Sequence, residues 1–254
     1  MEILQFDFMR NALLVGLLVS IACGMIGTYV VVKRIVFISG GISHTAYGGI
    51  GLGYYLGFNP MLGATLFTIT AALGMGLVQQ RSSQRQDTVI GVMWAVGMAL
   101  GIMFVKLSPG YTADLMSYLF GSILTVPQRD ILFILLLDLL IIAAVFRYFE
   151  EFKAIAFDEE FARVSGLKVE FFNILLLILV ALTVVVMIRA VGIILVIALL
   201  TIPPAIAGEF SRGLKGMMGF SVVLGIIFTT AGLYLSYLFD LPSGATIILV
   251  AAAG

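Results

Sequence analysis

The sequence predicts an all-α, polytopic membrane protein with eight or nine transmembrane helices. Apolar residues make up 61% of its 254 residues and charged residues only 11%. Several apolar runs reach or exceed the roughly 20 residues that a helix needs to cross a bilayer. No ten-residue alternating pattern indicates a membrane barrel, so each span must satisfy its backbone hydrogen bonds as a helix. Lys and Arg balance Asp and Glu at 14 each, which gives no electrostatic reason to expect a nucleic-acid partner.

The apolar runs place the elements in order. They predict helices at residues 11–32, 36–57, 59–79, 88–107, 130–149, 171–188, 190–210 and 217–238, with a short last helix at 243–254. Basic residues gather in alternate connections, around 33–34, 81–85, 147–168 and 212–215. The positive-inside rule therefore places these connections in the cytoplasm and the N-terminus outside. We expect a single integral-membrane domain over residues 1–254, with Cys23 as a small buried thiol.

The connection at 108–129 differs from the others. It is too short and polar for a full span and too apolar for a free loop. Two interpretations are open: a re-entrant or interfacial helix on the outer side, and a simple surface helix with Tyr111 and Tyr118 at the headgroups.

The longest cytoplasmic connection, 149–170, contains a short predicted helix. Asp158 is suited to cap its start, Glu159 and Glu160 to its first turn, and Gly166 to its end. Its apolar residues recur at helical spacing on one face: Phe157, Phe161 and Val164. Such a short helix is marginal in water unless it packs against something. The pattern alone leaves two interpretations open: the helix packs on the protein's own spans, or it inserts into a groove of a soluble partner.

Two prolines interrupt the apolar run after Arg189. Pro203 and Pro204 lack amide hydrogens and crowd the carbonyl groups of Leu199 and Leu200, which predicts a kink or break there. In a membrane, a broken helix is tolerated against protein or along a water-filled path. A place in the transport pathway and a passive kink are both consistent with the sequence.

The only histidine of the chain, His44, lies in a glycine-rich apolar stretch from Ile35 to Gly53. On a helix that starts at Ile35 it falls roughly 13 Å along the axis, near mid-membrane. Small residues surround it at helical spacing and permit close helix approach: Gly40, Gly41, Thr45, Gly48, Gly49 and Gly53. A neutral imidazole binds borderline divalent ions, so His44 is a candidate residue of a metal pathway; the alternative is a histidine that bonds a neighbouring carbonyl group.

Asp138 is the second candidate, because it interrupts the apolar run Leu135-Leu-Leu-Asp-Leu-Leu. An ionisable residue inside a span is costly and points to a function or to a local partner. Both interpretations stay open: a pathway residue, or a residue that pairs with a neighbouring helix.

Taken together, these segments resemble the permease subunits of metal-ion ABC importers, the ABC-3 family, over essentially the whole chain. The segments that carry the resemblance are Phe8-Met-Arg-Asn-Ala-Leu-Leu, Gly27-Thr-Tyr-Val-Val-Val-Lys-Arg, Phe37-Ile-Ser-Gly-Gly-Ile-Ser-His, Gln86-Asp-Thr-Val-Ile-Gly, Phe157-Asp-Glu-Glu-Phe-Ala-Arg-Val-Ser-Gly-Leu, Val191-Gly-Ile-Ile-Leu-Val-Ile-Ala-Leu-Leu-Thr-Ile-Pro-Pro-Ala and Leu241-Pro-Ser-Gly-Ala-Thr-Ile. The resemblance implies a type II-like importer permease fold in the cell membrane and uptake of zinc, manganese or iron(II).

The resemblance also implies partners and roles. It implies a homodimer with the ion path at its interface, two ABC ATPase subunits in the cytoplasm and a metal-binding protein outside. The family's membrane histidine corresponds to His44. Many members have an aspartate one turn earlier, where this chain has Gly40. The family's coupling helix, which docks on the ATPase, corresponds to about 157–168, with these named positions: Asp158, Glu159, Phe161, Ala162 and Gly166.

No phosphate-binding GxxxxGK[ST] motif occurs in the chain. The prediction is therefore a transport subunit that binds no cofactor, carries a divalent ion and depends on ATP hydrolysed by a partner. Two alternatives are a permease for a metal chelate such as a siderophore or cobalamin, and an ATP-independent secondary transporter or channel. The chelate permeases resemble longer chains without this histidine motif, and a secondary transporter should carry acidic relay residues in several spans.

Overall fold

The computed structural model describes residues 6–81, 86–109, 118–119, 121 and 123–254. Within these ranges the regular secondary structure is entirely helical, which confirms the all-α prediction. The chain divides into two compact units. The first unit comprises Met1–Arg34, Met116–Arg147 and Val186–Gly254, and the second comprises Ile35–Leu115 and Tyr148–Val185.

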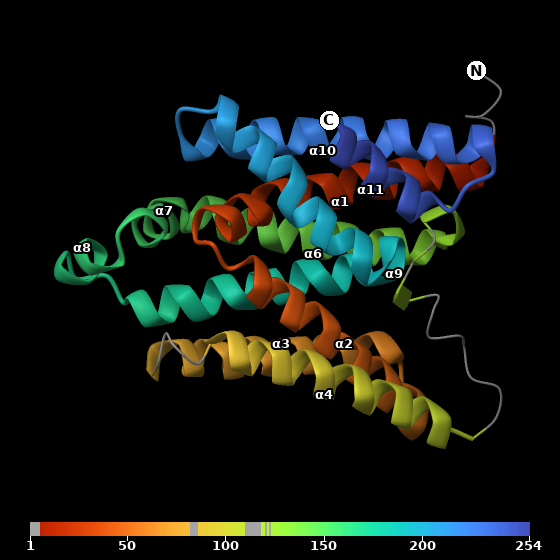
Figure 1. The fold of residues 1–254 in the computed structure, drawn as a ribbon, viewed down its shortest axis with the longest axis horizontal. Helices are drawn as coiled ribbons and strands as arrows, with labels where there is room; N and C mark the ends of the chain where they lie inside the picture. Colours follow the sequence, from red (N-terminus) through yellow and green to blue (C-terminus); the bar gives the residue numbers. More distant parts are fainter. Residues whose placement is uncertain (1–5, 82–85, 110–117, 120, 122) are drawn as a thin grey trace. The chain divides into compact units, whose positions relative to one another are not determined.

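The helices follow the apolar runs closely (Figure 1). They are α1 (Asp7–Val32), α2 (Val36–Leu56), α3 (Pro60–Arg81), α4 (Gln86–Leu107), the 3₁₀ turn η3 (Ile123–Thr125), α6 (Gln128–Arg147), α7 (Phe149–Phe157), α8 (Glu159–Val164), α9 (Val169–Phe210), α10 (Leu214–Phe239) and α11 (Ser243–Ala253). Each predicted span therefore coincides with a helix or with part of one. The connection at 149–170 holds two helices, α7 and α8, where one was expected.

Five of the described helical segments are long and apolar enough to cross a membrane, or six if α6 and the following α7 form one bent span. The five are Asp7–Val32, Pro60–Val78, Asp87–Leu107, Ala190–Phe210 and Leu214–Phe239. The predicted count of eight or nine stays a prediction. It also includes α2, which is rich in glycine and hydroxyl side chains, and the shorter apolar segments Val169–Val185 and Ser243–Ala253.

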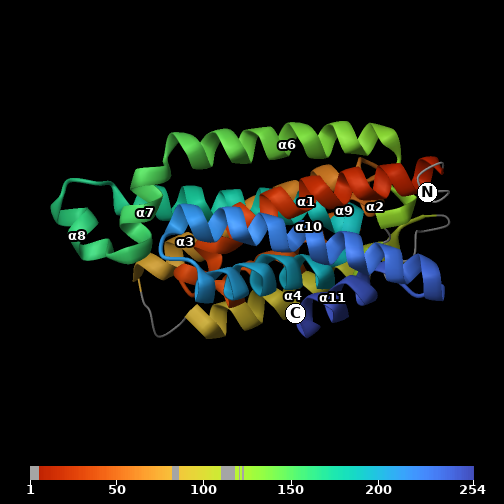
Figure 2. The ribbon, with the colours of Figure 1, turned by 90° about the horizontal axis from the view of Figure 1, so that it is seen from above.

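The first unit is built on α1, which packs against α6 and α10 (Figure 2). Small residues allow the close approach. A Cβ atom added at Gly24 would lie 2.7 Å from the backbone nitrogen of Val222 on α10. Cys23 is buried, as predicted, and its thiol donates to the Met187 sulfur at 3.0 Å. Inside a bilayer the hydrophobic effect does not drive helices together, because lipid tails are as apolar as the side chains. Close van der Waals packing of this kind is therefore a main source of helix association.

The break in α9 lies at Gly192, where φ is 77° and ψ is 164°. Helical structure continues through Pro203 and Pro204, so the kink or break expected there is not a break. Pro204 leaves the carbonyl group of Leu200 without its usual intrahelical donor. Gly27 of α1 covers this carbonyl group: a Cβ atom there would lie 2.5 Å from the Leu200 oxygen and 2.8 Å from Pro204 Cγ.

Part of the 108–129 connection packs beside this break. Gly121 has a positive φ of 62°, and a Cβ atom there would clash with the backbone of Val191 and Gly192. Ile123 and Val126 are also buried. Ile123 and Val126 thus pack inside the first unit, and both interpretations of the connection stay predictions. Tyr111 lies outside the described residues.

The second unit brings α2 into contact with α3 and α4 over its length. The predicted small-residue surface of α2 makes these contacts. A Cβ atom at Gly49 would clash with the backbone of Gly63 on α3, and one at Gly53 would lie 2.6 Å from Pro60 Cα. A Cβ atom at Gly97 of α4 would lie 2.7 Å from Thr45 Cα. Backbone therefore meets backbone on both sides of α2.

Replacing Gly49 by Ala should destabilise this packing by about 1–3 kcal/mol, because the added methyl group meets backbone that has no room to yield. The midpoint of thermal unfolding in detergent measures the effect. Gly74→Ala on α3 is the matched control, since a Cβ atom there has no neighbour within 4 Å. Equal midpoints for the two variants would contradict the described contact between α2 and α3.

Candidate functional site

His44 lies on the packed part of α2 and is 7% exposed. Its imidazole stacks on the indole ring of Trp94 from α4, with ring centroids 3.9 Å apart and planes inclined by 15°. Its Nδ1 atom is buried and has no hydrogen-bond partner among the described residues. The alternative that His44 bonds a neighbouring carbonyl group is therefore not supported at Nδ1. An unpaired buried ring nitrogen is an available metal ligand.

Gly40, one turn before His44, is buried in the same helix and brings no side-chain ligand. No group of three or more His, Cys, Asp or Glu side chains in the described ranges is arranged to hold a metal ion. One copy of the chain therefore offers a single imidazole at this point.

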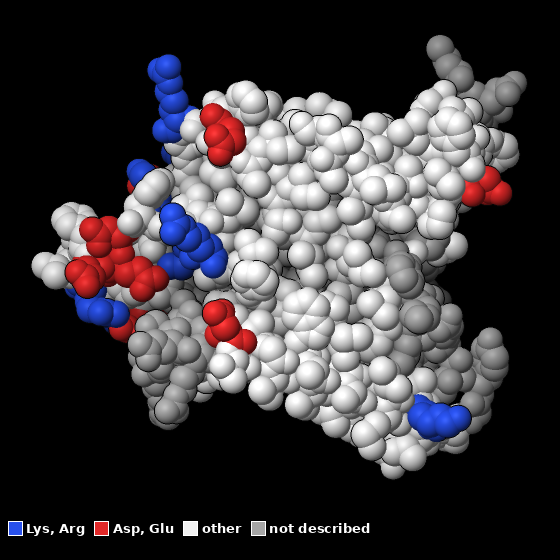
Figure 3. Space-filling view, in the orientation of Figure 1, with Lys and Arg blue, Asp and Glu red and all other residues white. Residues whose placement is uncertain are grey.

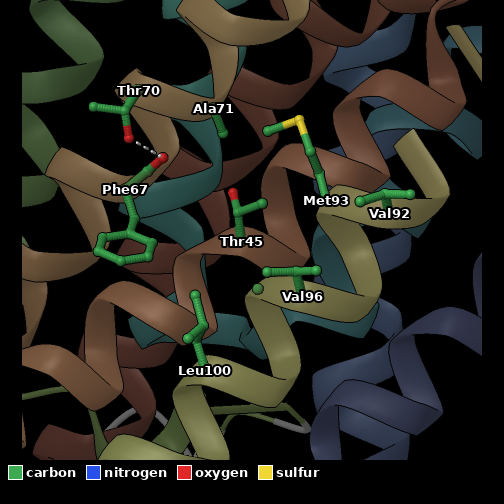
Figure 4. A pocket seen from close by; sticks show the side chains of 9 residues that line it. Thr45, Phe67, Thr70, Ala71, Val92, Met93, Val96 and Leu100 are labelled. Carbon is green, nitrogen blue, oxygen red and sulfur yellow. Dashed lines mark hydrogen bonds between the residues drawn. The ribbon is translucent and has the colours of Figure 1, made fainter. Parts of the chain in front are cut away.

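A groove of about 280 Å³ lies beside this part of α2. It is lined by Thr45, Phe67, Thr70, Ala71, Val92, Met93, Val96, Gly97 and Leu100 (Figure 4). Its two hydroxyl groups are used locally: Thr45 donates to the Ile42 carbonyl group at 2.7 Å, and Thr70 donates to that of Phe67 at 2.9 Å. The lining is otherwise apolar, so the groove has little to hold a cation, and the candidate ligand remains His44.

Asp138 belongs to the first unit, at the buried face of α6. It is 1% exposed, and neither carboxylate oxygen has a hydrogen-bond partner among the described residues. The structure thus shows no local partner that would account for an acidic side chain in a span. A buried carboxyl group without a partner is costly, so its presence is consistent with a function.

Helix α8 has the ends that the sequence predicts. The Asp158 carboxylate accepts a hydrogen bond from the Phe161 amide at 2.9 Å, as an N-cap does. Gly166 has a φ of 86°, and the Leu167 amide donates to the Ala162 carbonyl group at 3.0 Å, which closes the helix in a Schellman motif. Ala162 is fully buried and anchors the inner face.

The outer face of α8 is apolar and uncovered. Phe161 is 68% exposed and Val164 88%, and Phe157, the last residue of α7, is 67% exposed as well. Figure 3 shows acidic and basic side chains gathered over α7 and α8, while the spans in the same view carry few. Exposed aromatic side chains ringed by charges are typical of a protein–protein contact. This face is not covered by the described part of the chain.

The other side of α8 is fastened to the start of α9. Arg163 forms an ion pair with Glu170 at 2.9 Å, and the Asn173 amide donates to Glu159 at 3.2 Å. Helix α7 supports the same region through Phe152, which is fully buried and lies edge-on to Phe172 with centroids 6.1 Å apart. Helix α8 is therefore held on its inner side and free on its outer side.

Removing the N-cap by Asp158→Ala should weaken α8 by about 1 kcal/mol, because the Phe161 amide loses its acceptor. Amide hydrogen exchange of Glu159–Val164 measures this local change. Glu160→Ala, an exposed change in the same turn, should leave the exchange near that of the unaltered chain. Equal protection in the Asp158 variant and the unaltered chain would contradict the capping role.

Comparison with known proteins places the chain among transport proteins. A family model described as the ABC 3 transport family matches residues 5–253. The chain belongs to this family. The predicted resemblance to metal-ion ABC permeases is confirmed, and the protein is a multi-pass protein of the cell membrane.

Several individual proteins are similar to this chain over nearly its whole length. An uncharacterized membrane protein of Synechocystis sp. is 53% identical, over 99% of this chain and 89% of its own. The manganese transport system membrane protein MntC of Listeria monocytogenes is 35% identical, over 98% of this chain and 89% of its own. The structure of PsaBC from Streptococcus pneumoniae in complex with Fab has a TM-score of 0.89 at 31% identity, covering 99% of this chain and 90% of that one. These likenesses establish the ABC permease architecture.

Nothing in the sequence indicated that Trp94 belongs to the candidate site. It stands in the run predicted as the span 88–107, where an aromatic side chain is ordinary. Only the packing of α4 on α2 places it against His44. Its distance from His44 in sequence left no local signal of the contact.

Proposed function

We propose that this chain is the membrane-spanning permease subunit of an ATP-driven importer of divalent metal ions. Manganese is the cargo that the names of its relatives favour, with zinc or iron(II) as the other ions suited to imidazole. The observation that carries the proposal is His44, a buried imidazole with an unpaired Nδ1 atom on a tightly packed helix. The chain itself is a transport subunit and not an enzyme.

His44 acts on the ion as it crosses. A neutral imidazole offers an in-plane lone pair, and the surrounding protein excludes competing water. Since one copy supplies a single imidazole, we propose that a second copy of the permease contributes its own His44 across the pathway. Gly40 brings no carboxylate next to this ligand. Asp138, a buried acidic side chain of the first unit, is a second proposed pathway residue, argued from its own surroundings alone.

Helix α8 is the proposed contact with the partner ATPase. Its uncovered aromatic face is suited to a groove on a soluble protein, and the named positions Asp158, Glu159, Phe161, Ala162 and Gly166 shape and hold it. An external metal-binding protein would deliver the ion to the opposite side. Neither ATP nor a resident cofactor is assigned to this chain.

A packing route inside the second unit connects α8 with His44. Helix α8 is ion-paired to the start of α9. The next turns of α9 meet α3, where a Cβ atom at Gly76 would lie 2.9 Å from Ile174. Helix α3 in turn meets α2 through Gly63 and Gly49. Because closely packed helices shift as bodies, a displacement of α8 by the ATPase reaches the helix that carries His44.

The proposed cycle is alternating access. ATP binding closes the two ATPase subunits, the docked α8 helices move with them, and the spans change the side on which the pathway opens. Hydrolysis and product release return the ATPases and reset the permease. The protein's own residues supply the ion ligand and the mechanical contact.

The composition of the native complex tests this proposal. The chain is purified from its membrane in mild detergent, and the co-purifying polypeptides are identified by mass spectrometry. Recovery of an ATPase with a phosphate-binding loop and of a metal-loaded external protein is the expected result, and the bound metal identifies the cargo. Recovery of the chain alone, with metal uptake in vesicles that lack ATP, would instead support a secondary transporter or channel.

A further inference from the structure

We infer that Trp94 is a positioning residue for metal transfer, and that it holds the His44 imidazole in the orientation in which it meets the ion. This inference rests on the proposed role of His44. It adds a second residue, from a different helix, to the candidate site. Trp94 does not ligate the ion; it acts through the ring that does.

The stack fixes the plane of the imidazole. The two rings are nearly parallel, at 15°, with centroids 3.9 Å apart. One face of the imidazole is therefore covered by indole, and the ring cannot rotate about its Cβ–Cγ bond without losing the contact. A metal ion binds an imidazole nitrogen in the plane of the ring, so the indole, which covers a face of the ring, does not itself occupy the position of the ion.

The backbone around the stack leaves little freedom to either ring. Gly97 lies three residues after Trp94 on α4, and a Cβ atom there would lie 2.7 Å from Thr45 Cα and 3.2 Å from the His44 carbonyl oxygen. On the preceding part of α4, the Ile90 side chain packs on Gly41, where an added Cβ atom would lie 3.1 Å from Ile90 Cγ2. Helices α2 and α4 are thus in close contact on both sides of the ring pair, through the Ile90 side chain on one side and through backbone at Gly97 on the other.

The stack on Trp94 holds the His44 ring in place without bonding its Nδ1 atom, which packing alone would not require. The Nδ1 atom of His44 stays without a protein partner while its ring is held in place. A ligand whose orientation is already fixed loses less conformational entropy when the ion binds. Trp94 therefore holds the His44 ring in the orientation in which it binds an ion. Loss of Trp94 should raise the KM for the ion more than it lowers the maximal rate of transport.

The first test measures uptake by the complete transporter in vesicles, with Mn²⁺ as the probe. Trp94→Leu removes the aromatic face and should raise the KM for Mn²⁺ by roughly two- to tenfold, the range that a lost aromatic pair gives. The maximal rate should stay close to that of the unaltered protein. Trp94→Phe keeps an aromatic face and should restore most of the affinity. Met93→Leu, at the neighbouring groove position, should leave KM unchanged.

The second test uses fluorescence, because Trp94 is the only tryptophan of the chain. The emission of the unaltered complex minus that of the Trp94→Phe complex isolates the signal of Trp94. Mn²⁺, which is paramagnetic, should quench this signal when it reaches His44. The same subtraction in a His44→Gln background should show no quenching.

The outcomes separate this inference from the proposed function. A raised KM in Trp94→Leu, its restoration by Phe and quenching that needs His44 support the inference. His44-dependent quenching with an unchanged KM in Trp94→Leu overturns the positioning role and leaves the metal pathway standing. Undiminished uptake by His44→Gln overturns the metal pathway and this inference together. If Trp94→Leu fails to assemble, the absence of Mn²⁺ quenching in the unaltered complex overturns the inference by itself.

Discussion

Replacing His44 by Gln is expected to lower metal uptake at limiting metal by at least about tenfold. Loss of a group that merely orients a metal ligand typically costs 10–100-fold in metal affinity, and His44 is proposed as the ligand itself. Glutamine keeps a polar side chain of similar length, so the close contacts of α2 are preserved. The measurement is the initial rate of radiolabelled Mn²⁺ uptake in membrane vesicles.

The control for this prediction is Thr45→Ser, because Thr45 is the next residue on α2 and its hydroxyl group bonds the backbone of its own helix. Its uptake should match that of the unaltered protein, and both variants should reach the membrane in equal amounts. Undiminished uptake by His44→Gln at limiting Mn²⁺ would contradict a pathway role and leave His44 as a packing residue beside Trp94.

Replacing Phe161 by Glu is expected to abolish the coupling of transport to ATP while the protein still inserts and folds. Phe161 is 68% exposed, so the substitution removes little from the core of the chain. Placing a charge on the apolar face of α8 should exclude it from a hydrophobic groove on the partner, a loss of the size found for central interface residues, about 2 kcal/mol or more. Co-purification of the ATPase and metal-stimulated ATP hydrolysis both report the effect.

Glu160→Gln is the matched control, since it alters a charge at an exposed position of the same helix outside its apolar face. It should retain ATPase binding and uptake. The docking assignment of α8 would have to be abandoned if Phe161→Glu took up metal and retained the ATPase as well as this control does.

Local chemistry made much of this fold predictable. The apolar runs located the helices within a few residues, as the predicted span 36–57 and the observed α2 at Val36–Leu56 illustrate. Asp158 and Gly166 defined α8 because capping depends on neighbouring residues alone. The glycines of α2 predicted close helix contacts, and the structure supplies them at Gly49 and Gly53.

Features that depend on distant parts of the chain were not predictable in this way. A kink or break in α9 was expected at Pro203 and Pro204, the obvious helix breakers of the sequence. The non-helical residue is instead Gly192, against which Gly121 packs, and nothing near Gly192 in sequence indicated that contact. Gly27 accommodates the carbonyl group that Pro204 leaves unpaired, so the helix continues. The Trp94 stack on His44 likewise depends on the packing of two helices.

ATP-dependent metal uptake by the reconstituted complex decides whether this chain is the permease of an ATP-driven importer. The permease and its co-purifying ATPase are placed in proteoliposomes with the external metal-binding protein, and entry of Mn²⁺ is followed with and without ATP on the ATPase side. The account predicts uptake that requires ATP and that is lost in both His44→Gln and Phe161→Glu. Uptake at the same rate without ATP, or in both variants, would contradict it.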